Sequence, residues 1–90
     1  MVRPMSLAER FEDAQKKVKT LSRAPDNDTL LSLYALYKQG TAGDVSGKRP
    51  GMLDLKGRAK WDAWDRKKGL GREQAMEQYC QLVDRLVAGG

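Results

Sequence analysis

Histidine is absent from this chain of 90 residues, and cysteine occurs only once. Without histidine, the chain lacks the side chain that most often serves as a general base or a metal ligand near neutral pH. The single Cys80 can neither close an intramolecular disulfide nor supply a cysteine cluster for a metal, and it is expected to be a small, partly buried residue. No carboxylate pair stands out from an ordinary solvated helix surface. We therefore expect no enzyme, no metal and no cofactor.

Long hydrophobic runs are also missing. No apolar stretch approaches the ~20 residues that cross a bilayer. The first ten residues contain Arg3 with no apolar segment behind it, which argues against a secretory signal. Residues 1–5 are expected to be a loose tail. With 40% hydrophobic and 32% charged residues, the composition is that of one small globular domain spanning residues 1–90.

The net charge of +5 is unevenly distributed. Residues 48–72 contain nine basic and three acidic residues, whereas residues 73–90 contain one basic and three acidic residues. A local excess of cations indicates an anionic partner, such as a phosphate group, a nucleic acid or an acidic lipid. From the charge alone, a basic surface that only aids solubility is the simpler interpretation.

Four helices are expected from apolar periodicity and from residues that begin or end helices. Ser6 and Glu9 form a capping-box pattern ahead of the first apolar stripe. Pro25 separates the first helix from the second, and Asp26-Asn27-Asp28 offers N-cap oxygens just beyond it. Gly40 is expected to end the second helix. Asp54 is a candidate N-cap for the third helix. The expected ranges are 7–21, 27–39, 55–68 and 72–87.

Neither a strand-like alternation nor an internal repeat is present, so the sequence predicts an all-α bundle of four helices. The connection between the second and third helices is rich in glycine and takes about 14–16 residues. Loops of that length without secondary structure of their own are uncommon and often functional. Each helix has only the one apolar stripe that a bundle core requires, and we therefore expect a monomer.

The second and third predicted helices contain the most informative pattern. On a helix, Tyr34, Tyr37 and Lys38 stand at positions i, i+3 and i+4, so two phenols and an ammonium share one face. Lys56 and Lys60 stand at i and i+4 and would also project together. Two flexible cations and two aromatic rings are suited to a phosphorylated ring such as a nucleotide, through charge-assisted hydrogen bonds and stacking.

Plainer interpretations exist for each of these residues. Taken singly, the tyrosines and lysines are read more simply as boundary and exposed side chains. Trp61 and Trp64 stand three positions apart, a spacing more typical of core packing than of a binding box. On the second helix, Leu30, Leu33 and Tyr37 are expected to form one apolar side.

Ordered motifs extend the pattern along the chain. They are the runs Tyr34-x-x-Tyr37-Lys38-Gln39, Thr41-x-Gly43-Asp44, Arg49-Pro50-Gly51-Met52-Leu53-Asp54 and Lys56-Gly57-x-Ala59-Lys60-Trp61-Asp62-Ala63-Trp64. Each run is weak by itself, but the ordered combination is highly specific. In this combination the chain closely resembles the acyl-CoA-binding protein family, from Phe11 to Leu86.

The resemblance implies a small, non-catalytic, cytosolic carrier of long-chain acyl-CoA thioesters, with four helices in up-down-down-up order. In that family the positions matching Tyr34, Lys38 and Lys60 hold the 3′-phosphate of CoA, and the ring matching Tyr37 lies by the adenine. Such a carrier would shield the acyl chain from water and contact membranes or acyl-CoA-using enzymes only transiently.

The same resemblance extends to further positions and has two departures. Residues matching Lys56 and Tyr79 line the same cleft, and the residue matching Lys19 on the first helix faces the ligand. Gly40 stands where the family more often has a helix-compatible small residue, and Gln15 stands where a small alanine is common, which bears on the acyl-chain length. Apolar candidates for the wall of the acyl groove are Leu31, Met52, Leu53 and Leu55.

Two other functions stay open on the residues alone. A basic helical nucleic-acid-binding domain is favoured by the cations of residues 48–72 and the nearby aromatic rings, although Asp54, Asp62 and Asp65 interrupt the charge. We expect no nucleic acid as a partner. An interaction module that docks a partner protein would need an exposed apolar patch, which the sequence neither shows nor excludes.

Overall fold

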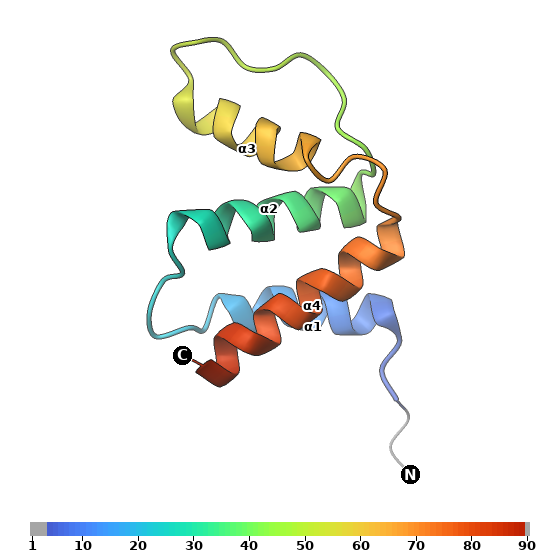
Figure 1. The fold of residues 1–90 in the computed structure, drawn as a ribbon. Helices are drawn as coiled ribbons and strands as arrows, with labels where there is room; N and C mark the ends of the chain where they lie inside the picture. The colour runs from blue at the N-terminus through green and yellow to red at the C-terminus, as the bar shows by residue number, and fades with distance from the viewer. Residues whose placement is uncertain (1–3, 90) are drawn as a thin grey trace.

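The computed structural model describes residues 4–89, which contain four α-helices and no strand (Figure 1). The helices are α1 (Leu7–Val18), α2 (Asn27–Thr41), α3 (Leu55–Asp65) and α4 (Arg72–Gly89). Of the expected loose tail, residues 1–3 lie outside the described residues, and Pro4 and Met5 are exposed and not helical. None of the described helices is long and apolar enough to span a membrane.

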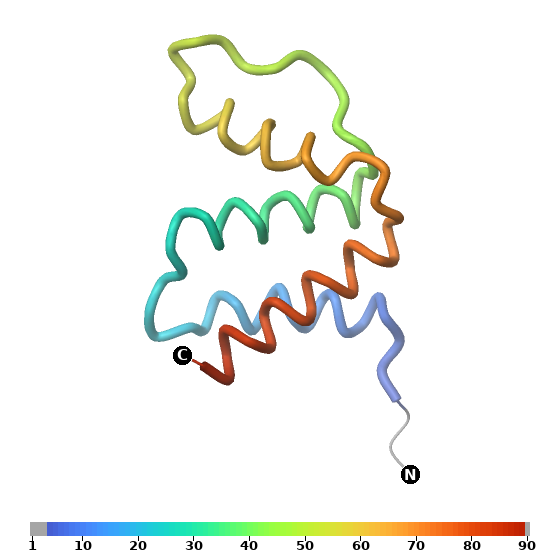
Figure 2. Tube along the Cα trace, in the orientation of Figure 1, coloured from blue at the N-terminus to red at the C-terminus, as the bar shows by residue number. Residues whose placement is uncertain are grey.

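The helices follow the up-down-down-up order. α2 and α3 run in the same direction, and α1 and α4 run in the opposite one (Figures 1 and 2). Because α2 and α3 are parallel, the chain has to travel back along the length of α2 before α3 begins. The segment 42–54 makes this return as an overhand loop. The all-α fold and the long connection between the second and third helices are confirmed.

The core lies where α4 packs against both α1 and α2, while α3 packs against α2. Its buried members are Phe11, Ala14, Leu33, Leu36, Ala75, Tyr79, Cys80 and Val83. Ala75 and Val83 are completely buried, which marks the line along which α4 is covered by the other two helices. Burial of Cys80 confirms its expected packing role, and burial raises the pKa of its thiol.

Gly40 does not end α2, contrary to expectation. The helix continues through it to Thr41, and Gly40 is buried. A Cβ at this position would lie 3.1 Å from Met76 Cγ and 3.4 Å from Phe11 Cζ. Gly40 therefore marks a close approach of α2 to α4 and to the Phe11 side chain rather than a left-handed cap.

Other helix ends also differ from the expected ones. α1 stops at Val18 rather than Leu21, because the next two backbone N–H groups bond to carbonyls three residues back and tighten the last turn. α3 stops at Asp65 rather than Lys68 for the same reason, and the chain turns away at Gly69, where φ is +90°. α4 extends two residues beyond its expected end.

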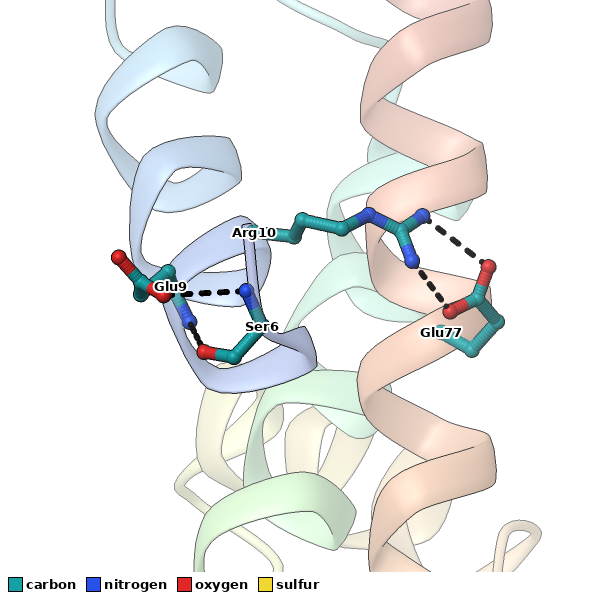
Figure 3. Close-up of polar contacts among 4 residues, drawn as sticks. All are labelled: Ser6, Glu9, Arg10 and Glu77. Atoms are coloured by element: carbon teal, nitrogen blue, oxygen red, sulfur yellow. Dashed lines mark hydrogen bonds and ion pairs between the residues drawn. The ribbon is translucent and has the colours of Figure 1, made fainter. Parts of the chain in front are cut away.

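The predicted N-caps are confirmed. Ser6 Oγ accepts a hydrogen bond from the backbone N–H of Glu9 at 3.2 Å, and Glu9 Oε1 accepts one from the backbone N–H of Ser6 at 3.0 Å (Figure 3). Asp26 and Asp54 each accept a hydrogen bond from the backbone N–H three residues on, at the starts of α2 and α3. These caps satisfy donors that a helix start leaves without a partner.

A bidentate ion pair joins α1 to α4. The two terminal nitrogens of Arg10 donate to the carboxylate oxygens of Glu77 at 2.9 and 3.1 Å (Figure 3). The hydrogen bonds from Arg10 hold the pKa of Glu77 below its ordinary value. The pair fixes how these two helices are turned relative to each other at the end where α1 begins.

Candidate functional site

Two lysines lie on aromatic rings across the seam between α2 and α3. Lys60 Nζ of α3 lies 5.5 Å from the ring centroid of Tyr34 of α2. In the reverse direction, Lys38 Nζ of α2 lies 4.9 Å from the ring centroid of Trp64 of α3. Both distances are within the range of a cation–π interaction. We refer to Tyr34, Lys38, Lys60 and Trp64 as the cation–aromatic cluster.

The parallel course of α2 and α3 explains this arrangement. Tyr34 and Lys38 are one turn apart on α2, and Lys60 and Trp64 are one turn apart on α3, so each pair lies on one face of its helix. When parallel helices pack together, each further turn of one stays beside the next turn of the other. The sequence spacing was therefore sufficient to bring each pair to one face, but only the packing of the helices pairs Tyr34 with Lys60 and Lys38 with Trp64.

Trp64 is the anchor of the cluster. It is 8% exposed, and its indole N–H donates to the backbone carbonyl of Gly43 at 2.8 Å. The packing role expected for Trp64 is confirmed, and the Lys38 ammonium also lies over its ring. Trp61 is only half-buried. Because burial and the indole hydrogen bond both fix the Trp64 ring, this ring holds the Lys38 ammonium in a defined place.

Tyr37 and Tyr79 belong to a second aromatic group, built around Phe11. The Phe11 ring stacks on Tyr37 with centroids 6.0 Å apart and meets Tyr79 edge-on at 5.1 Å. Tyr37 is 38% exposed, while Tyr79 is buried. Burial and the neighbouring Tyr37 raise the pKa of the Tyr79 hydroxyl. Tyr37 thus presents a ring to solvent that is supported from below by α1 and α4.

Lys19 and Lys56 are both exposed and lie at helix ends. Lys19 is the C-cap residue of α1 and is exposed. Lys56 is exposed one turn before Lys60, in the first turn of α3. The structure thus brings Tyr34, Lys38 and Lys60 into one cluster, whereas neither Lys19 nor Lys56 lies on an aromatic ring among the described residues.

Leu30 was assigned to the wrong face by the sequence. It was expected beside Leu33 on one apolar side, but Leu33 is buried and Leu30 is 45% exposed. Leu30 is one turn before Tyr34, so it continues the exposed face of α2 that contains the cluster. Continuing the helix register by one turn also sets Leu30 level with Lys56. The i, i+4 spacing to Tyr34 was the signal that could have identified it.

The other apolar candidates for a groove are distributed differently. Leu31 is half-buried, whereas Met52, Leu53 and Leu55 extend into solvent and form no wall in this structure. Gln15 folds back on its own helix, where its side-chain amide donates to the backbone carbonyl of Phe11 at 3.3 Å.

The overhand loop is tied at both ends by residues of the sequence motifs. Near its start, Asp44 Oδ1 accepts hydrogen bonds from the side chain of Gln39 and the backbone N–H of Gly69, each at 2.8 Å. Near its end, Arg49 makes a bidentate pair with Asp62 of α3 at 2.8 and 2.7 Å. The hydrogen bond from the Gly69 N–H, followed by that from the Gln39 side chain, lowers the pKa of Asp44. The hydrogen bonds from the Arg49 guanidinium lower the pKa of Asp62. Four residues of the sequence motifs, Gln39, Asp44, Arg49 and Asp62, therefore fix the overhand loop in place.

The chain is similar to known proteins over most of its length. The family model described as acyl-CoA binding protein matches residues 8–83. The chain belongs to the acyl-CoA-binding protein family. It is 58% identical to acyl-CoA-binding protein homolog 1 of Caenorhabditis elegans over 78 residues, covering 87% of this chain and 91% of that protein. It is 48% identical to the Drosophila melanogaster homolog over 82 residues, covering 91% and 95%.

Solved structures of the family have the same fold. The crystal structure of acyl-CoA-binding protein 2 of Oryza sativa is 44% identical and superimposes with a TM-score of 0.89, covering 93% of each chain. The solution structure of the yeast acyl coenzyme A binding protein is 45% identical with a TM-score of 0.72, covering 91% of this chain and 95% of that one. The family consists of binding proteins rather than enzymes, in agreement with the expectation from the sequence.

Proposed function

We propose that this family member is a non-catalytic carrier that binds long-chain acyl-CoA thioesters. The observation that carries the proposal is the cation–aromatic cluster, in which two lysines from different helices are held beside a tyrosine by aromatic rings. Family membership supports the ligand class. The carrier is proposed to work as a monomer in the cytosol.

The 3′-phosphate of CoA is assigned to Tyr34, Lys38 and Lys60. Two ammoniums and one phenol offer charge-assisted hydrogen bonds, each contributing a net ~1.5–3 kcal/mol. The lysines are oriented before the ligand arrives, because Lys38 lies on the fixed Trp64 ring and Lys60 lies on Tyr34. Less side-chain freedom is then lost on binding.

The adenine is assigned to Tyr37, whose ring is exposed on one side and stacked on Phe11 on the other. Tyr79 contacts the Phe11 ring edge-on and is proposed to support this stack from the side of α4. Lys56 and Lys19, both exposed, are assigned to the outer CoA phosphates and to the side of the ligand that faces α1. They are expected to contribute less than Lys38 and Lys60 because they are not held in place by a ring.

The acyl chain adds an apolar term. Each buried methylene contributes roughly 0.8 kcal/mol, so ten buried carbons approach ~8 kcal/mol before entropy losses. We assign Leu30, exposed on the same face of α2 as Tyr34, to this part of the site. Since the head group and the tail both contribute, the protein should prefer the intact thioester to free CoA or free fatty acid.

Calorimetry on delipidated protein with palmitoyl-CoA, free CoA and palmitate tests this proposal. The thioester should bind most tightly. Lys38→Ala and Tyr34→Phe should each weaken it by about 1–3 kcal/mol, because a bound phosphate loses a donor. Lys17→Ala is the matched control, since Lys17 is an exposed lysine of α1 whose ammonium pairs with Asp13. Equal affinity of folded Lys38→Ala and wild type would refute the phosphate assignment.

Salt dependence separates the carrier from a nucleic-acid-binding domain. Binding to nucleic acid falls steeply with salt because it depends on counterion release, while a large apolar term is insensitive to salt. The basic segment is also less available for a polyanion than its composition indicates, because Arg49 is paired with Asp62. Tight binding of RNA or DNA, with none of the thioester, would favour the alternative.

A further inference from the structure

The overhand loop begins with a turn of three residues, Ala42, Gly43 and Asp44, which we name the Asp44 turn. The Gly43 carbonyl accepts a hydrogen bond from the indole N–H of Trp64 at 2.8 Å. The backbone N–H of Ala42 donates to the carbonyl of Lys38 at 2.7 Å. Lys38 and Trp64 belong to the cation–aromatic cluster, where the Lys38 ammonium lies over the Trp64 ring. The Asp44 turn is therefore bonded to both members of this pair.

The Asp44 carboxylate joins the turn to the rest of the fold. Its Oδ1 accepts from the side chain of Gln39 on α2 and from the backbone N–H of Gly69, each at 2.8 Å. Gly69 lies 25 residues further along the chain, between α3 and α4. Gly43 has a φ of +84°, and glycine populates other backbone conformations about as readily. The bonds of Asp44 therefore help to keep the neighbouring Gly43 carbonyl directed at the Trp64 indole.

Gln39 is a buried amide whose two N–H donors are both used. It is 1% exposed, and its Nε2 donates to Asp44 Oδ1 and to the backbone carbonyl of Leu70, each at 2.8 Å. Because both neighbours are acceptors, only the amide nitrogen can face them. Its Oε1 has no hydrogen-bond partner among the described residues, which is unfavourable for a buried oxygen. The two donated bonds are therefore the reason for a glutamine at this position.

We propose that Asp44 is a positioning residue for the phosphate site. Its carboxylate holds the Asp44 turn, and the turn holds the Gly43 carbonyl on the Trp64 indole. The fixed Trp64 ring then keeps the Lys38 ammonium in place for the ligand. Asp44 does not contact the phosphate in this proposal, because two anions repel each other. The inference rests on the proposed function, in which Lys38 binds the 3′-phosphate.

Calorimetry with palmitoyl-CoA near neutral pH tests this role. Asp44→Ala removes the acceptor and should weaken binding about fivefold, since the Lys38 side chain is then less ordered before the ligand arrives. Asp44→Asn keeps an acceptor oxygen at the same place and should stay within about twofold of wild type. Both variants should fold because Asp44 is exposed. Glu77→Ala is the control: it removes the ion pair with Arg10 and should lower stability without weakening the thioester.

A double variant separates positioning from a purely structural role. If Asp44 acts through the Lys38 ammonium, its replacement has little left to disturb once that ammonium is gone. Asp44→Ala should then weaken palmitoyl-CoA binding by less than about twofold in a Lys38→Ala background. A general loss of structure would instead weaken binding by the same factor in both backgrounds.

The indole N–H signals in a ¹H–¹⁵N nuclear magnetic resonance spectrum supply a second readout. Trp61 and Trp64 are the only tryptophans of the chain, so two such signals are expected, and Trp64→Phe identifies the one from Trp64. The Trp64 N–H should exchange slowly with solvent in wild type and in Asp44→Asn, because the Gly43 carbonyl accepts it. It should exchange faster in Asp44→Ala.

Three results would overturn the role of Asp44 while leaving the proposed function intact. They are an unchanged palmitoyl-CoA affinity in Asp44→Ala, an equal loss of affinity with and without Lys38→Ala, and a Trp64 indole N–H that exchanges as slowly in Asp44→Ala as in wild type. A wild type that binds no palmitoyl-CoA would refute the proposed function and this role with it.

Discussion

Replacing Gly40 tests the packing of α2 against α4 and against the Phe11 side chain of α1. Two effects oppose each other in Gly40→Ala. Alanine is more favourable than glycine inside a helix by about 0.8–1 kcal/mol. The added Cβ would lie 3.1 Å from Met76 Cγ, closer than ordinary contact, while its 3.5 Å distance to the backbone nitrogen of Met76 is normal. Met76 has a flexible side chain that can move aside, so Gly40→Ala should stay within about 1 kcal/mol of wild type.

Gly40→Val should behave differently. Valine has little helix advantage over glycine, and its two further methyl groups must fit where the Cβ already touches Met76 and Phe11. Overpacking of this kind costs about 1–3 kcal/mol. We therefore expect Gly40→Val to lower the free energy of unfolding by about 2 kcal/mol.

Urea denaturation followed by circular dichroism measures both variants. The midpoint should fall for Gly40→Val without a change in slope, and adding Met76→Ala should restore part of the loss. Gly89→Val is the control, because a Cβ at this helical glycine meets no atom within 4 Å. A Gly40→Val protein as stable as wild type would refute the close approach of the helices. A large loss in Gly40→Ala would contradict the role given to the mobile Met76 side chain.

Three further predictions concern bonds and burial seen in the structure. Trp64→Phe keeps a ring but removes the hydrogen bond to the Gly43 carbonyl, and should cost about 1 kcal/mol in urea denaturation; an unchanged midpoint would show that this bond contributes nothing. Because Arg10 lowers the pKa of Glu77, their pair should stabilise the fold fully near neutral pH and lose its effect as the pH falls through that lowered pKa. Glu77→Gln should therefore melt earlier near neutral pH and lose less on acidification to about pH 3, and an acid response identical to wild type would rule out this linkage. Cys80 should react with a thiol reagent only at the rate of unfolding, since it is buried with a raised pKa, and rapid reaction of the native protein would contradict that burial.

The sequence was most informative where the signal is local. Ser6, Asp26 and Asp54 cap three helices as their residue types indicate, because a cap depends only on the next three residues. Helix ends were less reliable. Gly40 is of a residue type that commonly follows a helix end, but it lies inside α2. The packing around it, against Met76 of α4 and Phe11 of α1, outweighs the low helix propensity of glycine.

For the ligand site, the sequence alone determined which side chains share a helix face, since the i, i+4 spacing of Tyr34 and Lys38 follows from the helix repeat. It also determined the family, through an ordered set of motifs. Only the tertiary structure decided that Lys38 lies on Trp64 and that Leu30 faces solvent. The physical reason is the sequence separation over which each feature is set. Helix caps and helix faces are decided within one turn of a helix. Contacts between α2 and α3 depend instead on how the two helices pack after the overhand loop has brought them together.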